Sequence, residues 1–260
     1  MNDRFSLKGK TALVTGGGRG LGKFISAGLA EAGADIVITS RKMKNLEAAA
    51  QEIMSKYGVK ALPLACDLAS EQEIAAMVEE ASKTFPKIDI LVNNSGATWG
   101  APTLEFPLER WDQLFSINVR GVWILSQKIA NRMKEQGGGT IINISSVMGF
   151  RGSEESVHPS VPYNSTKAAV NLLTMNLAVK LAPFKIRVNA LALGYFHTDM
   201  TSYLDKDDFK EEYETLLGMT PLRRFGDEED IKGVAVFLAS DASAYVNGHV
   251  LVCDGGFLAR

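Results

Sequence analysis

Short apolar runs alternate along the chain with longer segments of helical period, and this alternation constrains the fold more than any other feature. The runs are nearly continuous in apolar residues, which is typical of strands buried on both faces of a parallel sheet. The sequence therefore predicts one α/β domain over residues 1–260, a doubly wound parallel seven-stranded sheet with helices on both faces. The predicted strands are 11–16, 35–40, 60–65, 88–94, 140–145, 186–192 and 249–254, and the predicted amphipathic helices include 42–57, 70–85 and 109–135.

Composition excludes several classes of protein. The chain has 260 residues, of which 46% are hydrophobic and 22% charged, with a formal net charge of −2. Nucleic acids and anionic membranes attract clustered Lys and Arg, so this balance predicts neither as a partner. The start, MNDRFSLKGK, has no apolar leader, and no run reaches the roughly 18 apolar residues of a membrane span. We expect a cytoplasmic protein that acts on small molecules.

Two segments interrupt the regular alternation. Residues 149–162 are rich in turn-forming and charged residues, and residues 195–218 read as an extra helical insertion before the last strand. Both follow the ends of predicted strands, which is the edge where open α/β sheets bind ligands. We therefore predict a substrate loop at 149–162 and a helical lid at 195–218.

A glycine-rich turn, TGGGRGLG, follows the first predicted strand and opens a helix. Gly16, Gly20 and Gly22 would let the backbone turn tightly and approach a pyrophosphate, whose charge suits the free N–H groups of a helix N-terminus. The spacing is G-x-x-x-G-x-G and differs from G-x-G-x-x-G. A tight strand-to-helix connection without a ligand is the alternative, and the strand–turn–helix context favours a dinucleotide site.

The end of the second predicted strand indicates which dinucleotide is bound. NAD(H) is usually held there by a carboxylate on the ribose hydroxyls, whereas a 2′-phosphate calls for Arg. The sequence reads Thr39-Ser40-Arg41-Lys42, without a carboxylate, and Arg19 in the glycine turn adds a second guanidinium. This favours NADP(H), with NAD(H) possible. The alternative is that Arg41 and Lys42 are solvated charges at a helix start.

Tyr163 and Lys167 lie four residues apart in VPYNSTKAAVNLL, so they share one face of a predicted helix. The pair alone could simply be solvated. With the surrounding motifs, however, the chain resembles the short-chain dehydrogenase/reductase family over essentially its whole length. The matching pieces are TGGGRGLG, CDL, NNSG, SINVRG, INISS, YNSTK, RVNALALG and DGG, each weak alone and together highly specific. The resemblance implies a single-domain Rossmann fold and an oxidoreductase.

The resemblance also assigns catalytic roles. It implies that Tyr163 is the general acid/base, that Lys167 lowers the pKa of Tyr163 together with an oxidised nicotinamide, and that Lys167 binds the nicotinamide ribose. Ser146, rather than its neighbour Ser145, matches the residue that hydrogen-bonds the substrate oxygen. Asn118 matches the residue that holds a water in the proton relay to the lysine.

Cofactor and substrate residues follow from the same resemblance. Asn93 with Gly96 matches a supporting loop, and no metal-ligand spacing is present. The residues implied for cofactor binding are Gly16, Arg19, Gly20, Leu21, Gly22, Ser40, Arg41, Asp67, Leu68, Asn94, Gly96, Tyr163, Lys167, Gly194 and Thr198. Those implied for the substrate are Ser146, Met148, His158, Tyr163 and Tyr195, and Trp99, Phe150, Arg151, Glu154 and Phe196 are further pocket candidates.

The substrate itself stays open at this point. The loop and the GYFHTDMT segment resemble the gluconate 5-dehydrogenase-like branch, so a keto-sugar acid is one expectation. A 3-oxoacyl thioester is the alternative, weakened because Gly137–Gly139 and Ala182–Phe184 stand where carrier-protein reductases present basic side chains. Hypotheses of another class are a non-catalytic NADP-binding regulator and a purely structural oligomer module. The intact set of Asn118, Ser146, Tyr163 and Lys167 favours the enzyme.

We also expect a homotetramer, because this family recurrently assembles through two interfaces. One pairs the helices after the fourth and fifth strands, and the other joins the last helix and strand. The segment 109–135 and the apolar C-terminal segment offer material for both. A two-fold interface is self-complementary, so an apolar tail such as Phe257-Leu258 is expected to bury against its own copy. The alternative is that these side chains cover only their own sheet.

Overall fold

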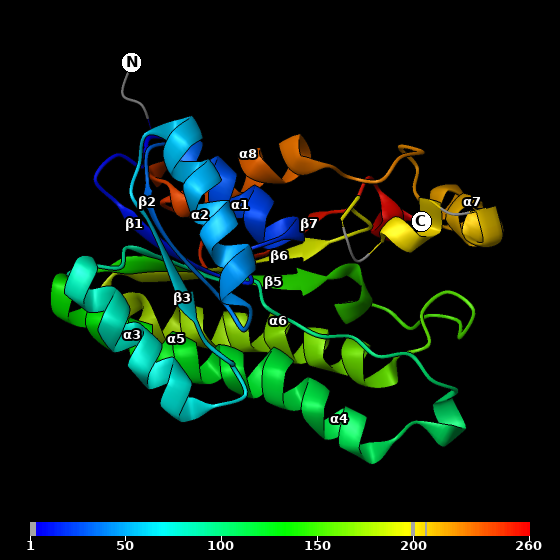
Figure 1. Cartoon of the computed structure of the whole chain (residues 1–260). Coiled ribbons are helices and arrows are strands. Elements are labelled where there is room, and N and C mark those ends of the chain that lie inside the picture. The colour runs from blue at the N-terminus through cyan, green and yellow to red at the C-terminus, as the bar shows by residue number, and fades with distance from the viewer. Residues whose placement is uncertain (1–3, 199–200, 206) are drawn as a thin grey trace.

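The computed structural model describes residues 4–198, 201–205 and 207–260, and a seven-stranded parallel sheet lies at its centre (Figure 1). The strand order is β3-β2-β1-β4-β5-β6-β7. The predicted fold class is confirmed, since each predicted apolar run overlaps one strand. The strands are β1 (Thr11–Thr15), β2 (Asp35–Ser40), β3 (Ala61–Ala65), β4 (Ile90–Asn93), β5 (Gly139–Ser146), β6 (Ile186–Leu193) and β7 (Val250–Cys253).

Helices cover both faces of the sheet (Figure 1). One face packs against α1 (Gly20–Glu31), α2 (Met43–Tyr57) and α8 (Glu228–Ala239), and the other against α3 (Glu71–Thr84), α5 (Val122–Gln136) and α6 (Val161–Leu181). Each strand is therefore buried on both sides, so its residues are apolar without alternation. Within the described residues, no helix is long and apolar enough to cross a membrane.

The predicted helix 109–135 is divided in two. It comprises α4 (Leu108–Phe115), a π-helical turn at Ser116–Gly121, and α5. Gly121 ends the wide turn where a Cβ atom would lie 2.6 Å from the carbonyl oxygen of Leu68, so only glycine permits this approach. Single π-helical turns occur frequently at functional sites, and this one contains Asn118.

The strand order reverses between β1 and β4, because the chain builds β2 and β3 on one side of β1 and β4 to β7 on the other. At such a reversal the connections leave in opposite directions and open a crevice beyond the carboxyl ends of the strands. The fold therefore positions a ligand site between the turns that follow β1 and β4.

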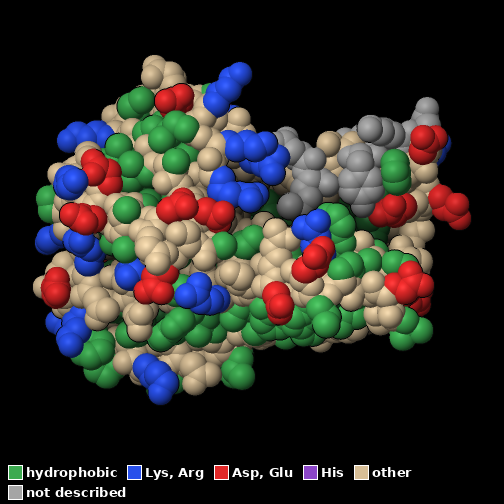
Figure 2. Space-filling view, turned by 60° about the horizontal axis from the view of Figure 1, so that its bottom comes forward, with side chains coloured by type: hydrophobic (Ala, Val, Ile, Leu, Met, Phe, Trp, Pro, Cys, Tyr) green, Lys and Arg blue, Asp and Glu red, His purple; other side chains and the backbone are tan. Residues whose placement is uncertain are grey.

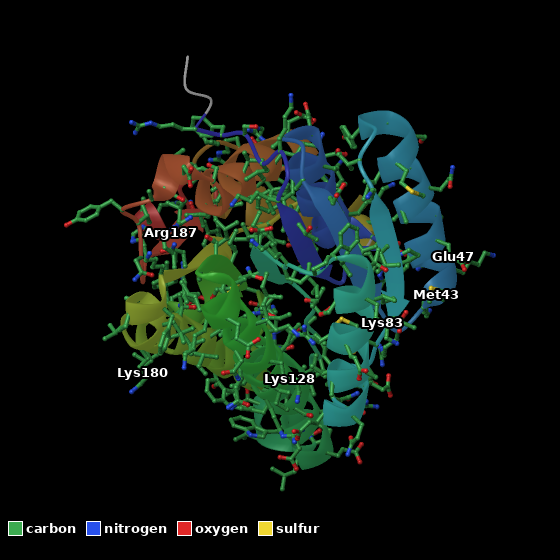
Figure 3. All side chains as sticks on the ribbon, turned by 90° about the vertical axis from the view of Figure 1, so that its left-hand side faces the viewer. Met43, Glu47, Lys83, Lys128, Lys180 and Arg187 are labelled. Atoms are coloured by element: carbon green, nitrogen blue, oxygen red, sulfur yellow. The ribbon has the colours of Figure 1, made fainter. Side chains whose placement is uncertain are left out.

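Arg187, the second residue of β6, binds several groups at the amino ends of the strands and is labelled in Figure 3. Its guanidinium donates to the carbonyl oxygens of Val246, Leu238 and Ser240 at 3.0–3.2 Å and to Thr140 Oγ1 at 3.1 Å. Burial lowers its pKa, and the nearby Asp241 raises it. These bonds join β5 and β6 to the segment after α8.

Further segments extend beyond the carboxyl ends of β5 and β6. The loop 149–162 follows a short helical turn, η3 (Val147–Gly149), and α7 (Lys210–Met219) lies near the C-terminus (Figure 1). The lid predicted at 195–218 includes α7, while its residues 199, 200 and 206 lie outside the described residues. That the loop and the lid act on a substrate stays a prediction.

Candidate active site

A cleft of about 500 Å³ lies at the carboxyl ends of the strands, where the strand order reverses. Every residue that the resemblance assigned to cofactor binding lines this cleft. The cleft also contains Ser146, Met148 and Tyr195 from the predicted substrate set. The tertiary structure thus brings together segments from the first turn to residue 201.

The glycine turn fits a pyrophosphate. Gly16 and Gly20 have φ angles of +70° and +50°, a region that side-chain-bearing residues rarely adopt. A Cβ atom on Gly22 would lie 2.3 Å from the carbonyl oxygen of Gly16, so glycine is required where α1 approaches the turn. Because α1 begins at Gly20, its free N–H groups border the cleft, as anion binding at a helix N-terminus requires.

Asn94 supports this turn from the end of β4. Its side-chain amide donates to the carbonyl oxygen of Thr15 at 2.7 Å, and its backbone N–H donates to Thr15 Oγ1 at 2.9 Å. The neighbouring Asn93 points away from the cleft into a buried network with Ser126 and Asn143. Asn93 therefore ties β4 to its neighbours, and Asn94 orients the glycine turn.

The far end of the cleft is basic. Arg19, Arg41 and Lys42 line it with exposed side chains. The cleft residues between β2 and β3 are Arg41, Lys42 and Asn45, and none of these is acidic. Asn45, in the first turn of α2, lines the same region and was not predicted, although its place four residues after Arg41 could have indicated it. Guanidinium and ammonium groups without a carboxylate fit a 2′-phosphate.

Tyr163 and Ser146 meet at the opposite end of the cleft. Tyr163 lies in the first turn of α6, and Ser146 ends β5. The Ser146 hydroxyl hydrogen-bonds the phenol of Tyr163 and accepts from the backbone N–H of Met148 at 3.1 Å. Ser145, on the other face of the strand, donates to Asn171 Oδ1 at 2.5 Å inside the core. The alternation of β5 thus directs Ser146, and not Ser145, toward Tyr163.

Lys167 lies one turn after Tyr163, and its side chain is 6% exposed. Its Nζ donates to the carbonyl oxygen of Ile144 at 2.8 Å and lies 5.5 Å from the centroid of the Tyr163 ring. An ammonium has three N–H donors, and the structure gives it this one acceptor among the described residues. The remaining donors are available to a ligand in the cleft.

Burial shifts the pKa values of Tyr163 and Lys167 in the directions that favour their uncharged forms. Burial raises the pKa of Tyr163, and the hydrogen bond from Ser146 offsets this only in part. Burial also lowers the pKa of Lys167 to about 8. Protein groups alone therefore do not lower the pKa of Tyr163, so the predicted lowering stays a prediction for the complex with an oxidised nicotinamide.

Asn118 lies behind the cleft and does not line it. Its Oδ1 accepts from the N–H of Ala97 at 2.8 Å, and its Nδ2 donates to the Ala97 carbonyl at 2.9 Å and to Thr166 Oγ1 at 3.1 Å. The side chain thus joins the loop after β4 to the helix that contains Tyr163. Its predicted role in holding a water stays a prediction.

Apolar residues on the inner wall of the cleft pack against a residue of the C-terminal tail that does not itself line the cleft. Phe257 is 1% exposed and packs with Val147, Met148, Tyr163 and Tyr195. The expectation that this tail residue buries against a second copy of the chain is wrong, because Phe257 is already buried in its own subunit. Sequence reasoning missed its place beside Tyr163, since no local pattern links residues so far apart.

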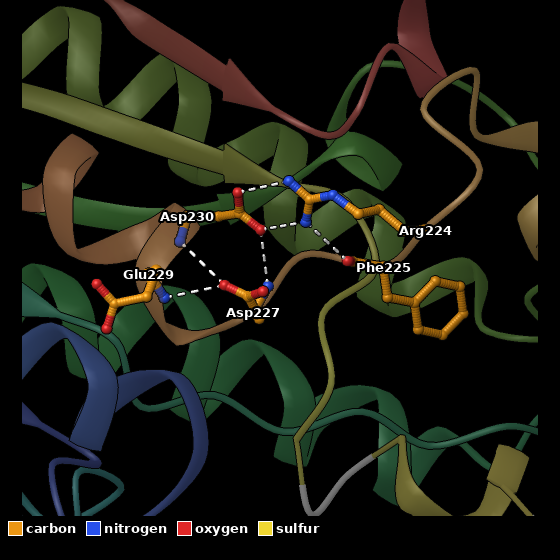
Figure 4. A network of polar contacts seen from close by, with 5 residues as sticks. All are labelled: Arg224, Phe225, Asp227, Glu229 and Asp230. Carbon is orange, nitrogen blue, oxygen red and sulfur yellow. Dashed lines mark hydrogen bonds and ion pairs between the residues drawn. The ribbon is translucent and has the colours of Figure 1, made fainter.

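Tyr195 is held in the cleft by aromatic neighbours. Its ring stacks on Phe225 at 5.5 Å and meets Phe257 edge-on at 5.7 Å. Phe225 precedes α8, and the adjacent Arg224 binds Asp230 with Nη2 to Oδ1 at 2.8 Å (Figure 4). Hydrogen bonding to Arg224 lowers the pKa of Asp230 to about 2, so this carboxylate stays charged.

The α8 start in Figure 4 is a capping box. Asp227 Oδ1 accepts from the backbone N–H groups of Glu229 and Asp230 at 2.9 and 3.2 Å, and Asp230 Oδ2 accepts from the N–H of Asp227 at 2.9 Å. The reciprocal bonds satisfy helix-end donors and fix the direction of the chain before the helix. The same segment therefore places Phe225 against Tyr195.

Several predicted substrate residues do not line the cleft. His158 packs edge-on against Tyr163 with ring centroids 5.0 Å apart, its Nε2 is buried without a hydrogen bond among the described residues, and burial lowers its pKa. Trp99 and Phe150 are 44% and 48% exposed at the rim. Conversely, the cleft includes residues that sequence reasoning did not assign. They are Gly18, Lys42, Asn45, Cys66, Ser95, Ala97, Thr98, Ile117, Ile144, Ser145, Val147, Leu193 and Thr201.

Among residues 4–198, 201–205 and 207–260, no three His, Cys, Asp or Glu side chains gather as metal ligands do. The site is thus one of hydroxyl, phenol and ammonium groups beside a dinucleotide-shaped cleft.

Known proteins match this chain over nearly its whole length. The sequence model of the family described as enoyl-(acyl carrier protein) reductase matches residues 16–258. The chain is 40% identical over 261 residues to the 2-dehydro-3-deoxy-D-gluconate 5-dehydrogenase of Pseudoalteromonas atlantica, with 100% of each chain covered. It is 39% identical over 250 residues to the 3-oxoacyl-[acyl-carrier-protein] reductase of Aquifex aeolicus, covering 96% of this chain and 98% of the relative.

A solved structure agrees with the fold and the cofactor. The gluconate 5-dehydrogenase of Burkholderia cenocepacia, in complex with NADP and tartrate, superposes with a TM-score of 0.91 at 37% identity, covering 99% of this chain and 98% of that one. Two relatives were crystallised with NADP, which agrees with the cofactor predicted for this chain. The resemblance inferred from sequence motifs is likewise confirmed by full-length matches. The chain belongs to the short-chain dehydrogenase/reductase family, as an oxidoreductase that acts on CH–OH groups with a nicotinamide cofactor.

Proposed function

We propose that this protein interconverts a keto-sugar acid of the gluconate class and its hydroxy acid with NADP(H). The observation that supports this best is one cleft with Ser146, Tyr163 and Lys167 at one end and the glycine turn with Arg19 and Arg41 at the other. The relatives named gluconate dehydrogenases, at about 40% identity over the full chain, indicate the substrate class.

Each of the residues Ser146, Tyr163, Lys167 and Asn118 has its own role in the proposed reaction. NADPH, when bound along the glycine turn, supplies the hydride for the carbonyl carbon. Ser146 and Tyr163, already hydrogen-bonded to each other, hold the carbonyl oxygen, and the Tyr163 hydroxyl donates its proton to that oxygen during reduction. Lys167, which lines the cleft one turn away, stabilises the phenolate that this transfer leaves on Tyr163 until the phenol takes up a proton from solvent. Asn118 positions the loop at Ala97 and the first turn of α6.

Turnover with a panel of carbonyl compounds tests this proposal. We expect loss of NADPH absorbance with 5-keto-D-gluconate, at a kcat/KM at least about tenfold above that for a 3-oxoacyl thioester. A preference for the thioester would instead favour the alternative, 3-oxoacyl reduction, which the Aquifex relative and the apolar Met148 in the cleft lining support. NADPH binding without turnover of any compound would favour a non-catalytic regulator.

We also propose a homotetramer, in line with the expectation from the family. A band of hydrophobic side chains runs along the lower part of Figure 2, on the side of the sheet that α3 to α6 cover. On α5 and α6, Trp123, Leu172, Met175 and Val179 are 40%, 62%, 44% and 77% exposed. Light scattering tests this, since the monomer mass is 28.2 kDa and a tetramer would have about four times that. A cytoplasmic location stays a prediction from the sequence.

A further inference from the structure

Arg151 lies beside the substrate end of the cleft, although it is not among the residues that line the cleft. It follows the η3 turn after β5, its side chain is exposed, and its guanidinium carbon lies 5.3 Å from the centroid of the Phe257 ring. Its Nε donates to the carbonyl oxygen of Gly152 at 3.1 Å. The ring and the carbonyl hold the guanidinium plane, while both terminal NH₂ groups remain free to bind a ligand.

The ring beneath Arg151 packs against residues that line the substrate end of the cleft and does not itself line it. Phe257 packs with Met148, Tyr163 and Tyr195, and Met148, Tyr163 and Tyr195 also line the cleft. The guanidinium therefore stands one aromatic ring away from the phenol that we assign as proton donor. A positive charge at this distance suits a group on the same small molecule whose carbonyl is held at Ser146 and Tyr163.

Two acids of the segments that contain Arg151 and Phe257 accept hydrogen bonds from other groups. Asp254 accepts from the N–H groups of Gly256 and Leu258, both at 2.8 Å, and Glu155 accepts from Thr103 Oγ1 at 2.9 Å. Among the described residues, no carboxylate forms an ion pair with Arg151. An aromatic-stacked guanidinium without an ion-pair partner, close to the residues of a pocket, has the planar donor pair that matches a carboxylate.

A second arginine offers an internal comparison. Arg110 of α4 stacks on Trp99 at 4.2 Å, and its Nη1 donates to Gln113 Oε1 at 2.9 Å. Part of this guanidinium is already bonded, and Trp99 does not belong to the apolar cluster that contains Phe257 and Tyr163. Arg110 thus shares the stacking geometry of Arg151 but not its connection to Tyr163.

From these contacts we infer that Arg151 binds the carboxylate of the substrate and so selects keto acids over neutral ketones. This inference rests on the proposed function and names the residue that would recognise the acid group. The recognised chemistry is a single carboxylate on a polyhydroxylated carbonyl compound, bound through both terminal nitrogens of the guanidinium.

The test compares 5-keto-D-gluconate with its neutral methyl ester, using NADPH and purified full-length protein. We expect the parent to prefer the acid, and Arg151→Gln to lower kcat/KM for the acid at least about tenfold while the ester changes by less than about twofold. Arg151→Lys, which keeps the charge but loses the planar donor pair, should fall between them. Arg110→Gln should leave both substrates unchanged.

A binding measurement separates the inference from the proposed function. With NADPH present, tartrate should raise the Tm of the parent but not of Arg151→Gln, and the neutral tetritol should raise neither. If no carbonyl compound is turned over but tartrate still binds through Arg151, the proposed function fails and the carboxylate site stands. If Arg151→Gln affects acid and ester equally, or if Arg110→Gln causes the selective loss, the inference is overturned.

Discussion

Arg187 and Lys167 are cations withdrawn from water at opposite ends of the same sheet, and their hydrogen bonds differ. At the amino ends, Arg187 donates to three carbonyl oxygens and one hydroxyl from three segments. At the carboxyl ends, Lys167 is more deeply buried and donates to one carbonyl oxygen, that of Ile144. The first cation is satisfied by the fold, and the second keeps donors for a ligand.

The same difference appears in their titration. Burial lowers the pKa of both groups, but a guanidinium remains charged because its ordinary pKa is above 12, whereas the pKa of Lys167 falls to about 8. Lys167 can therefore respond to a ligand near neutral pH and Arg187 cannot. We conclude that the amino end of the sheet is structural and the carboxyl end chemical, and four changes test this division.

The largest effect is expected at the chemical end. Tyr163→Phe should lower kcat at least about a thousandfold, because it removes the proton donor while the ring and its packing remain. NADPH affinity, followed by fluorescence titration, should change by less than about threefold. A kcat within about tenfold of the parent would show that Tyr163 is not the general acid.

At the structural end, Arg187→Met should lower the free energy of unfolding by about 2 to 4 kcal/mol, because it leaves buried carbonyl oxygens without donors. Urea denaturation measures this, and kcat per folded molecule should stay within about twofold. Lys180→Met is the control, since Lys180 points into solvent in Figure 3 and should change stability by less than about 0.5 kcal/mol. If Arg187→Met lowered kcat without lowering the free energy of unfolding, the amino end of the sheet would not be purely structural.

The basic end of the cleft sets cofactor choice. Arg41→Asp should shift the ratio of kcat/KM values for NADPH and NADH by about 10- to 100-fold toward NADH, because it removes a partner of the 2′-phosphate and adds an acceptor for ribose hydroxyls. Steady-state kinetics with each cofactor measures the ratio. Should the ratio stay unchanged, Arg41 is only a surface charge and Arg19 or Lys42 holds the phosphate.

The smallest effect concerns pH. The folded protein releases the Lys167 proton near pH 8, while the unfolded chain keeps it to about the ordinary value of 10.5. Between these values the unfolded state binds more protons, so this group makes stability rise with pH. Relative to Lys167→Met, which cannot titrate, the parent should gain about 1 kcal/mol between about pH 7.5 and 9, measured by urea denaturation. A constant difference across this range would contradict the lowered pKa.

Much of the cofactor half of the site could be predicted from local sequence. The glycine turn, Ser40-Arg41 and Asp67 each follow directly after a strand, so recognising the strand was enough to place them at one edge of the sheet. Asn94, which follows β4, lines the cleft for the same reason. A phosphate bound by backbone N–H groups requires only a glycine turn and the start of a helix, and a few consecutive residues of the sequence indicate both.

The substrate half was predicted less completely. His158, Trp99 and Phe150 lie in segments that follow strands, yet their rings do not line the cleft, because loop conformation and not strand direction orients them. Phe257 was expected at an interface between copies and instead lies beside Tyr163. Its position depends on the turn after β7, where Gly256 has a φ of +91° and Asp254 accepts two backbone N–H groups.

Periodicity and turn chemistry, which act over a few residues, therefore determined the parallel sheet, the edge that binds a ligand and the spacing of Tyr163 and Lys167. Long-range packing decided the rest: which of Ser145 and Ser146 meets the phenol, how far burial moves the pKa of Lys167, and that Phe257 of the tail is buried in its own subunit. Burial and hydrogen-bond partners are properties of surrounding segments, so they exist only once the chain has folded.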